Sequence, residues 1–157
     1  MYQLEVKQYL IENKFNPLDG WEITVDIDAM ERAKGPQHKP DKKERVKIAE
    51  NELKRMGATI GPHNKYGRID VCTTNNAGET YLIEVEGKSS RQKEQAMYSA
   101  LGQLLLIMNR PTKNTFYGIA VPDTPEWEIQ LSKIPTYIKN TLNLKCYLTS
   151  KESTREI

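Results

Sequence analysis

The fold of this chain is decided by residues 67–88, which read GRIDVCTTNNAGETYLIEVEGK. Within this segment, two stretches rich in β-forming residues flank the letters NNAG at 75–78, which are typical of a tight turn. We therefore expect two antiparallel strands joined as a hairpin. If the hairpin is centred on Ala77, Asp70 lies directly opposite Glu84 on the neighbouring strand.

The second of these strands carries charged side chains at every other position. Because successive side chains point to opposite faces of a strand, Glu84, Glu86 and Lys88 are expected on one face. Asp70 would complete a patch of three carboxylates, and opposed like charges destabilise a strand pair unless a cation compensates them. Carboxylate oxygens suit Mg²⁺ or Mn²⁺. With Lys88 beside such an ion, the patch has the groups needed for phosphodiester hydrolysis, although alternating Glu and Lys also occur on solvated sheet faces.

Outside the hairpin, hydrophobic periodicity predicts further helices and strands. The expected helices are 1–15, 41–56, 91–109 and 127–140, the last interrupted at Pro135, and the expected strands are 21–28, 58–60, 68–73, 80–88, 116–121 and 144–148. Asp41 is expected to cap the second helix, whose apolar face is Val46, Ala49, Leu53 and Met56. This order predicts an α/β fold in which helices flank a mixed sheet.

Length and composition favour one globular domain. The chain has 157 residues, of which 28% are charged and 38% hydrophobic, a balance that excludes collagen-like, membrane-spanning and strongly disordered proteins. Within it we expect an N-terminal helix and strand extension at 1–40, a core at 41–149 and a flexible tail at 150–157. The longest apolar run, 104–108, is too short to cross a bilayer, so we expect a cytoplasmic protein without a membrane partner. Cys72 and Cys146 are expected as reduced, partly buried thiols.

The net charge of +2 does not by itself indicate a nucleic-acid partner. Its distribution is more informative, because residues 32–47 contain seven basic and two acidic residues. Such a stretch can follow a phosphate backbone, and it can equally be a solvated surface.

The segments 67–71 and 82–88 together resemble the D…(D/E)xK motif of the PD-(D/E)XK nuclease superfamily. The resemblance extends over about residues 41–148, because a charged helix precedes the motif and the segments ALGQL (100–104) and YGIAVP (117–122) follow it. It implies a restriction-endonuclease-like fold with an αβββαβ core. It also implies an endonuclease that hydrolyses DNA with Mg²⁺ or Mn²⁺, and a homodimer is expected because duplex cleavage needs one site per strand.

Two registers of the motif fit the sequence. In the first, Glu86-Gly87-Lys88 is the ExK tripeptide, so Asp70 and Glu86 are metal ligands and Lys88 orients the attacking water. In the second, Glu84-Val85-Glu86 is the tripeptide, Glu86 takes the usual position of the lysine and Gly87 matches a glycine that often follows it. The centred hairpin slightly favours the second register. All of Asp70, Glu84, Glu86 and Lys88 are therefore candidate site residues.

The resemblance also suggests accessory residues and leaves a second function open. Gln95 and Gln103 belong to a polar stripe on the helix after the motif, where a Gln can contact the phosphate or simply face water. A Glu from the preceding helix, Glu50 or Glu44, is placed to assist the metal. Because a fold does not guarantee an activity, the alternative function is a non-catalytic nucleic-acid-binding or assembly module.

Overall fold

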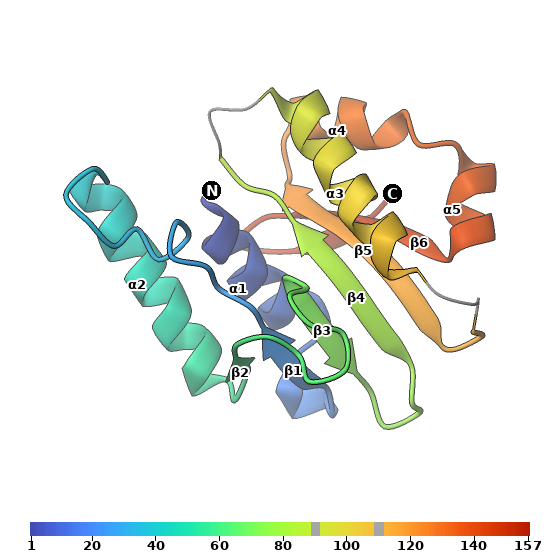
Figure 1. Ribbon diagram of the computed structural model, residues 1–157, viewed down its shortest axis with the longest axis horizontal. Helices are drawn as coiled ribbons and strands as arrows, with labels where there is room; N and C mark the ends of the chain where they lie inside the picture. The colour runs from blue at the N-terminus through green and yellow to red at the C-terminus, as the bar shows by residue number, and fades with distance from the viewer. Residues whose placement is uncertain (89–91, 109–111) are drawn as a thin grey trace.

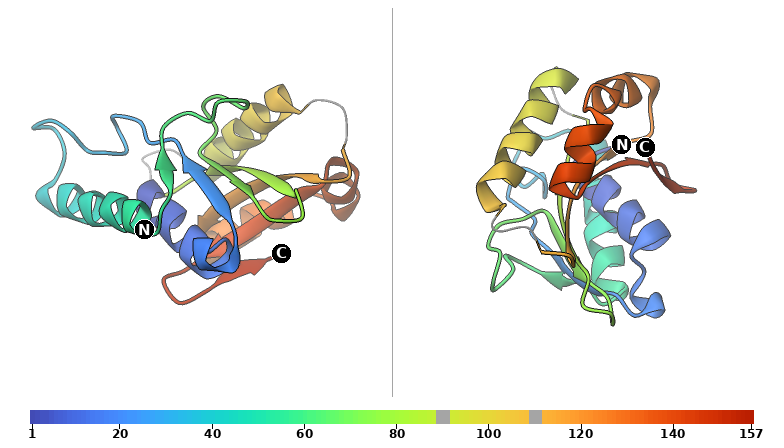
Figure 2. Two further views of the ribbon diagram at one scale, coloured as in Figure 1. Left: turned by 90° about the horizontal axis from the view of Figure 1, so that it is seen from below. Right: turned by 90° about the vertical axis from the view of Figure 1, so that its right-hand side faces the viewer.

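The computed structural model describes residues 1–88, 92–108 and 112–157, which form an α/β fold with helices on both faces of one mixed sheet (Figures 1 and 2). The strands of these described segments are β1 (Glu22–Val25), β2 (Thr59–Ile60), β3 (Val71–Thr74), β4 (Thr80–Val85), β5 (Thr115–Pro122), β6 (Leu144–Thr149) and β7 (Thr154–Glu156). The helices are α1 (Gln3–Lys14), α2 (Pro40–Arg55), α3 (Lys93–Ile107), α4 (Pro125–Ser132) and α5 (Thr136–Leu142), with a short 3₁₀ helix at Pro17–Asp19.

The strands follow the spatial order β2-β1-β3-β4-β5-β6-β7. β1, β3 and β4 are successively antiparallel, whereas β4, β5 and β6 are parallel to one another. The parallel strands lie in the middle of the sheet and are covered on both faces, which explains why β5 reads as an almost continuous apolar run.

Each face of the sheet has its own hydrophobic core. The first core joins the sheet to α1 and α2, and the second joins it to α3, α4 and α5. The right-hand view of Figure 2 shows the sheet nearly edge-on between these two groups of helices. Neighbouring residues of β4 illustrate the division, because Ile83 belongs to the first core and Leu82 to the second.

The predicted hairpin is confirmed, including its register. Val71 pairs with Ile83, a register that is centred on Ala77, and one further step along it would place Asp70 opposite Glu84. The turn is held by the Asn75 side chain, whose Oδ1 accepts hydrogen bonds from the backbone N–H groups of Ala77 and Glu79.

The strands of the hairpin are shorter than predicted. β3 begins at Val71 and β4 ends at Val85, so Asp70 precedes its strand and Glu86 and Lys88 follow theirs. The reason is that the backbone ladder stops at Asp70: the Val85 N–H donates to the Asp70 side chain instead of to a backbone carbonyl. Strand alternation therefore does not fix the directions of the Glu86 and Lys88 side chains.

The N-terminal segment is part of the sheet and core, and the expectation of an added extension at 1–40 is wrong in this respect. β1 lies between β2 and β3 and pairs with both. α1 packs against the sheet and buries Leu4, Leu10 and Ile11 completely or almost completely. Local periodicity predicted this helix and this strand, but it carries no information about which distant segments they contact.

The helices after β1 agree with prediction in most respects. Helix α2 buries Val46, Ala49 and Leu53, as expected, but it begins at Pro40, so Asp41 lies in its first turn and does not cap it. The predicted interruption at Pro135 is confirmed, because α4 and α5 are separate helices. The predicted helix 91–109 corresponds to α3, and its two end residues lie outside the described residues.

The C-terminal residues are ordered, in contrast to the predicted flexible tail. β7 pairs with β6, and the Arg155 guanidinium contacts Asp123 at 2.9 Å and Glu128 at 3.0 Å. These ion pairs join the last strand to the start of α4, a contact that the sequence pattern did not indicate. Among the described residues, no helix combines the length and apolar character that a membrane span requires.

Candidate active site

Asp70 lies at the point where β3 separates from β4. Its Oδ2 accepts hydrogen bonds from the Val85 N–H at 2.8 Å and from Gln3 Nε2 at 3.3 Å. Its backbone carbonyl accepts a hydrogen bond from the Asp26 N–H at 3.1 Å. The Asp70 carboxylate is therefore held in a fixed orientation between two strands and α1.

The partner of the other Asp70 oxygen is Lys7, a residue of α1. Lys7 Nζ lies 2.7 Å from Asp70 Oδ1, 2.6 Å from Glu31 Oε1 and 2.6 Å from the Asp26 carbonyl oxygen. Of these three contacts, the one to the Asp26 carbonyl is a hydrogen bond, and those to Asp70 and Glu31 are ion pairs. The Lys7 side chain is 0% exposed, so this ion pair lies inside the protein.

Burial of a charged amine is unfavourable unless its charge is compensated. Burial alone would lower the pKa of Lys7, but the charges of Asp70 and Glu31 outweigh that effect and hold the pKa above its ordinary value. Lys7 therefore stays protonated and acts as the internal counter-ion of this cluster.

The Glu84 carboxyl lies beside the Asp70 carboxylate. The Glu84 residue is only 6% exposed, and burial together with the negative charge of Asp70 raises its pKa to about 9. At neutral pH the Glu84 carboxyl is therefore protonated and donates a hydrogen bond to the Asp70 carboxylate. Burial, the largest cause, together with the charge of Asp70, also raises the pKa of Glu31.

The residues after β4 pass close to the N-terminal end of α1. The Glu86 N–H donates to the Ala120 carbonyl at 2.9 Å, and the Lys88 N–H donates to the Met1 carbonyl at 2.8 Å. Gly87 packs directly on the backbone before α1: a Cβ at this position would lie 2.6 Å from the Cα of Gln3 and closer still to its amide nitrogen. The motif glycine is thus required by a close backbone approach.

A groove of about 590 Å³ lies over this part of the fold, between the N-terminal ends of α1 and α2. Its basic and imidazole side chains are His38, Lys39, Lys42 and Lys88. Gln3 and Glu31 also line it, and these two residues contact Asp70 and Lys7 respectively. The groove therefore carries three lysines beside the two acidic residues Asp28 and Glu31, and it reaches residues that touch the carboxylate cluster.

The predicted accessory residues lie elsewhere. Gln95 and Gln103 are exposed on α3, where Gln103 Nε2 donates to Ser99 Oγ at 3.3 Å. Glu50 is paired with Lys54 at 2.8 Å and with Arg32 at 3.4 Å on α2, and these cations hold its pKa below the ordinary value even though burial opposes them. In the described parts of the chain, none of these three side chains contacts Asp70 or Glu84.

The donor chemistry of the cluster is compatible with a hard divalent ion. Within residues 1–88, 92–108 and 112–157, no three His, Cys, Asp or Glu side chains form a ready metal-binding group. Asp70 and Glu84 nevertheless supply two carboxylates in contact, and Mg²⁺ characteristically binds one or two carboxylates while keeping several waters. Burial and the negative charge of Asp70 disfavour a second negative charge at Glu84, and a cation bound beside them would compensate both. These residues therefore fit Mg²⁺ or Mn²⁺.

Sequence reasoning missed Lys7, Gln3 and Glu31. A signal was present for Lys7, because it lies three positions from both Leu4 and Leu10 and so falls on the apolar side of its helix. A lysine at such a position needs a buried acceptor, and this requirement could have directed attention to it. Nothing in the local sequence indicates that the acceptor is Asp70.

The two cysteines behave as predicted. Cys72 and Cys146 are free and buried. Burial raises the pKa of Cys72 to about 12 and that of Cys146 to about 11, so both thiols are protonated and unreactive at neutral pH.

Comparison of the chain with protein-family models, with curated proteins and with solved structures gives no match in any of the three. The functional assignment therefore depends on the geometry described above.

Proposed function

We propose that this protein is a metal-dependent nuclease that hydrolyses phosphodiester bonds of DNA. The observation that carries the proposal is the contact between the Asp70 carboxylate and the Glu84 carboxyl at the point where β3 separates from β4, next to a groove lined by lysines. Carboxylates in contact suit a divalent ion, and ammonium groups along a groove suit a phosphate backbone.

The order of elements supports a restriction-endonuclease-like core. Helix α1, strands β1, β3 and β4, helix α3 and strand β5 follow one another in the order αβββαβ, with α2 and β2 inserted between β1 and β3. The three strands are antiparallel neighbours and β5 is parallel to β4. In this assignment the core begins at α1, whereas the sequence resemblance began at about residue 41.

Residue roles follow from the contacts. Asp70 and Glu84 would hold the ion, which supports the register with Glu84-Val85-Glu86 as the tripeptide. The chemistry that a divalent ion would supply there, if bound, is an acidified water and neutralisation of charge on the phosphate. Lys7 fixes the orientation of Asp70 through Oδ1, and Lys88 is available in the groove to hydrogen-bond a phosphate oxygen.

The test is cleavage of plasmid and oligonucleotide DNA with Mg²⁺ or Mn²⁺, with and without EDTA. The wild-type protein should cut with either metal and stop in EDTA, and Asp70→Asn and Glu84→Gln should each reduce cleavage by at least about 100-fold. Asn is preferable to Ala at position 70 because it keeps the size of the side chain and one acceptor oxygen, which can serve either Lys7 or the Val85 N–H. Glu152→Gln, a change at an exposed residue between β6 and β7, is the matched control and should cleave like wild type.

A second candidate, a non-catalytic nucleic-acid-binding module, is favoured by one observation. The cluster is largely satisfied without a metal, because Lys7 pairs with Asp70 and Glu84 donates to it. DNA binding that weakens with salt but leads to no cleavage with either metal, and that survives Asp70→Asn, would replace the nuclease proposal with this one.

A further inference from the structure

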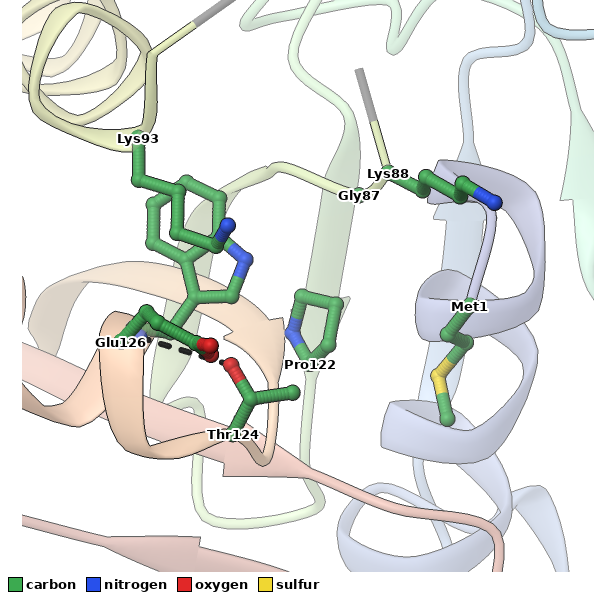
Figure 3. Close-up of a pocket in the computed structure, with 8 residues that line it drawn as sticks. Met1, Gly87, Lys88, Lys93, Pro122, Thr124 and Glu126 are labelled. Carbon is green, nitrogen blue, oxygen red and sulfur yellow. Dashed lines mark hydrogen bonds between the residues drawn. The ribbon is translucent and has the colours of Figure 1, made fainter. Parts of the chain in front are cut away.

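A second pocket, of about 190 Å³, lies beyond the end of β4 (Figure 3). It is bounded by the carboxyl end of β5 and by the first residues of α3 and α4, and it is lined by Met1, Gly87, Lys88, Lys93, Pro122, Thr124, Glu126 and Trp127. Ligands of α/β proteins characteristically bind at the carboxyl ends of parallel strands. The pocket has room for a ring-sized group, since its volume corresponds to about six water molecules.

In the described part of the chain, one hydrogen-bond donor in the wall of this pocket has no partner. Trp127 is 3% exposed and packs in the second core, yet none of the described residues accepts a hydrogen bond from its indole N–H. Among the described residues, the Trp127 nitrogen is not one of the fully buried side-chain atoms without a hydrogen bond, so it keeps some exposure. The pocket that Trp127 lines is therefore where its donor is available.

An acceptor and a cation lie in the same pocket. Figure 3 shows Lys93 extending from α3 toward Glu126, whereas Lys88 points away from Glu126 across the start of α1. The Glu126 carboxylate accepts hydrogen bonds from its own backbone N–H and from the Thr124 hydroxyl, which together with Lys93 keep its pKa below the ordinary value. The pocket thus presents an aromatic N–H, a carboxylate and an ammonium group around a small space.

We propose that this pocket binds a single unpaired base of a nucleic-acid strand. A base edge carries acceptors and, in adenine, cytosine and guanine, an exocyclic amine. The Trp127 N–H would donate to a ring nitrogen or carbonyl, and Glu126 would accept from the amine. Lys93 would contact the adjoining phosphate, and Pro122 would supply an apolar surface for the ring. A simple anion site is disfavoured because Glu126 lines the same space.

The position of the pocket connects it to the cluster. Gly87 lines the pocket and lies three residues after Glu84, a span of at most about 10 Å of extended chain. A base in the pocket would therefore belong to a nucleotide next to the phosphate at Asp70 and Glu84. This inference rests on the proposed function and deepens it: the preferred substrate is DNA with an unpaired nucleotide beside the bond that is cut.

The experiment measures binding in EDTA, so that no cleavage occurs. Two duplexes are compared, one with a bulged 2-aminopurine and one with the same base paired to thymine, and 2-aminopurine fluorescence reports whether the base is unstacked. The wild-type protein should bind the bulged duplex at least about fivefold more tightly. Trp127→Phe should weaken binding of the bulged duplex about fivefold and Glu126→Ala about tenfold, with no change for the paired duplex.

Two controls keep the outcomes distinct. Trp21→Phe changes the other tryptophan, which packs against Phe15 and Tyr81 outside the pocket, and should bind like wild type. Because Glu126 is exposed, Glu126→Ala tests the pocket even if Trp127→Phe destabilises the core.

Equal wild-type affinity for both duplexes, or unchanged binding by both pocket variants, would overturn the inference. Free adenosine monophosphate binding as tightly as the bulged duplex would overturn the strand as the source of the base. If the wild-type protein prefers the bulged duplex but does not cleave DNA with Mg²⁺, only the nuclease proposal is refuted.

Discussion

Replacing Glu84 by Gln should make the metal-free protein more stable, and the gain should grow with pH. In the folded protein the pKa of Glu84 is raised from its ordinary 4.5 to about 9, because the carboxyl is buried and faces Asp70. Between these values the folded protein holds a proton that the unfolded chain releases. Rising pH therefore favours unfolding, with a slope of up to about 1.4 kcal/mol per pH unit.

The magnitude follows from that slope. Over the three pH units from pH 5 to pH 8, Glu84 alone should lower the free energy of unfolding by at most about 4 kcal/mol, a large part of the roughly 5–15 kcal/mol typical of a domain. The substituted glutamine has no proton to lose, and its amide can donate to Asp70 as the protonated carboxyl does. The variant should match wild type near pH 5 and exceed it by about 2–4 kcal/mol at pH 8.

The measurement is urea denaturation followed by circular dichroism at pH 5, 6, 7 and 8 in EDTA. Glu152→Gln is the control and should keep the wild-type slope, since Glu152 is exposed. Other carboxyls such as Glu31 contribute to the slope of every variant, so the informative quantity is the difference between variant and wild type. A Glu84→Gln protein that loses stability with pH as steeply as wild type would refute the assignment of a buried, protonated Glu84.

Three further predictions concern the surroundings of the site. Gly87→Ala should lower the free energy of unfolding by about 2 kcal/mol or more, because the added Cβ would collide with the backbone of Tyr2 and Gln3. Gly102→Ala on α3 is the control, because a Cβ there meets open space, and it should be neutral or stabilising by up to about 1 kcal/mol. Chemical denaturation measures both variants. Lys7→Met should cost about 3–5 kcal/mol at pH 8 and less at pH 5, because burial raises the pKa of Glu31 and so favours its neutral form at the lower pH; an equal cost at both pH values would contradict the ion-pair account. Lys39→Gln with Lys42→Gln should reduce the slope of log K for DNA binding against log salt by about two, and an unchanged slope would exclude these lysines from phosphate contact.

The contact between Glu84 and Asp70 opposes stability above the ordinary pKa of a glutamate, and under the proposed function a cation would compensate it. Without a metal, the protein would be more stable with a residue at position 84 that has no proton to lose. The sequence nevertheless has a glutamate there, beside Asp70. Such unfavourable pairs are concentrated where a ligand compensates them. The predicted stabilisation by Glu84→Gln and the predicted loss of cleavage are therefore two consequences of the same contact.

Local sequence was sufficient wherever neighbouring residues determine the structure. The turn at 75–78 fixed the centre of the hairpin and so placed Asp70 opposite Glu84. The apolar spacing of Val46, Ala49 and Leu53 identified the buried face of α2, and Pro135 marked the break between α4 and α5. Turns, helical periodicity and proline act over a few residues, so they can be recognised without knowledge of the rest of the chain.

Only the tertiary structure decided which distant segments meet. The sequence determined that a lysine lies on the apolar side of α1, but not that its ammonium reaches Asp70 and Glu31. Neither the insertion of β1 beside β3 nor the pairing of β7 with β6 could be predicted, because strand partners are chosen by packing and hydrogen bonding across the whole sheet. The physical reason is the same in each case: burial and charge compensation are satisfied by whichever groups the complete fold brings together, and those groups lie far apart along the chain.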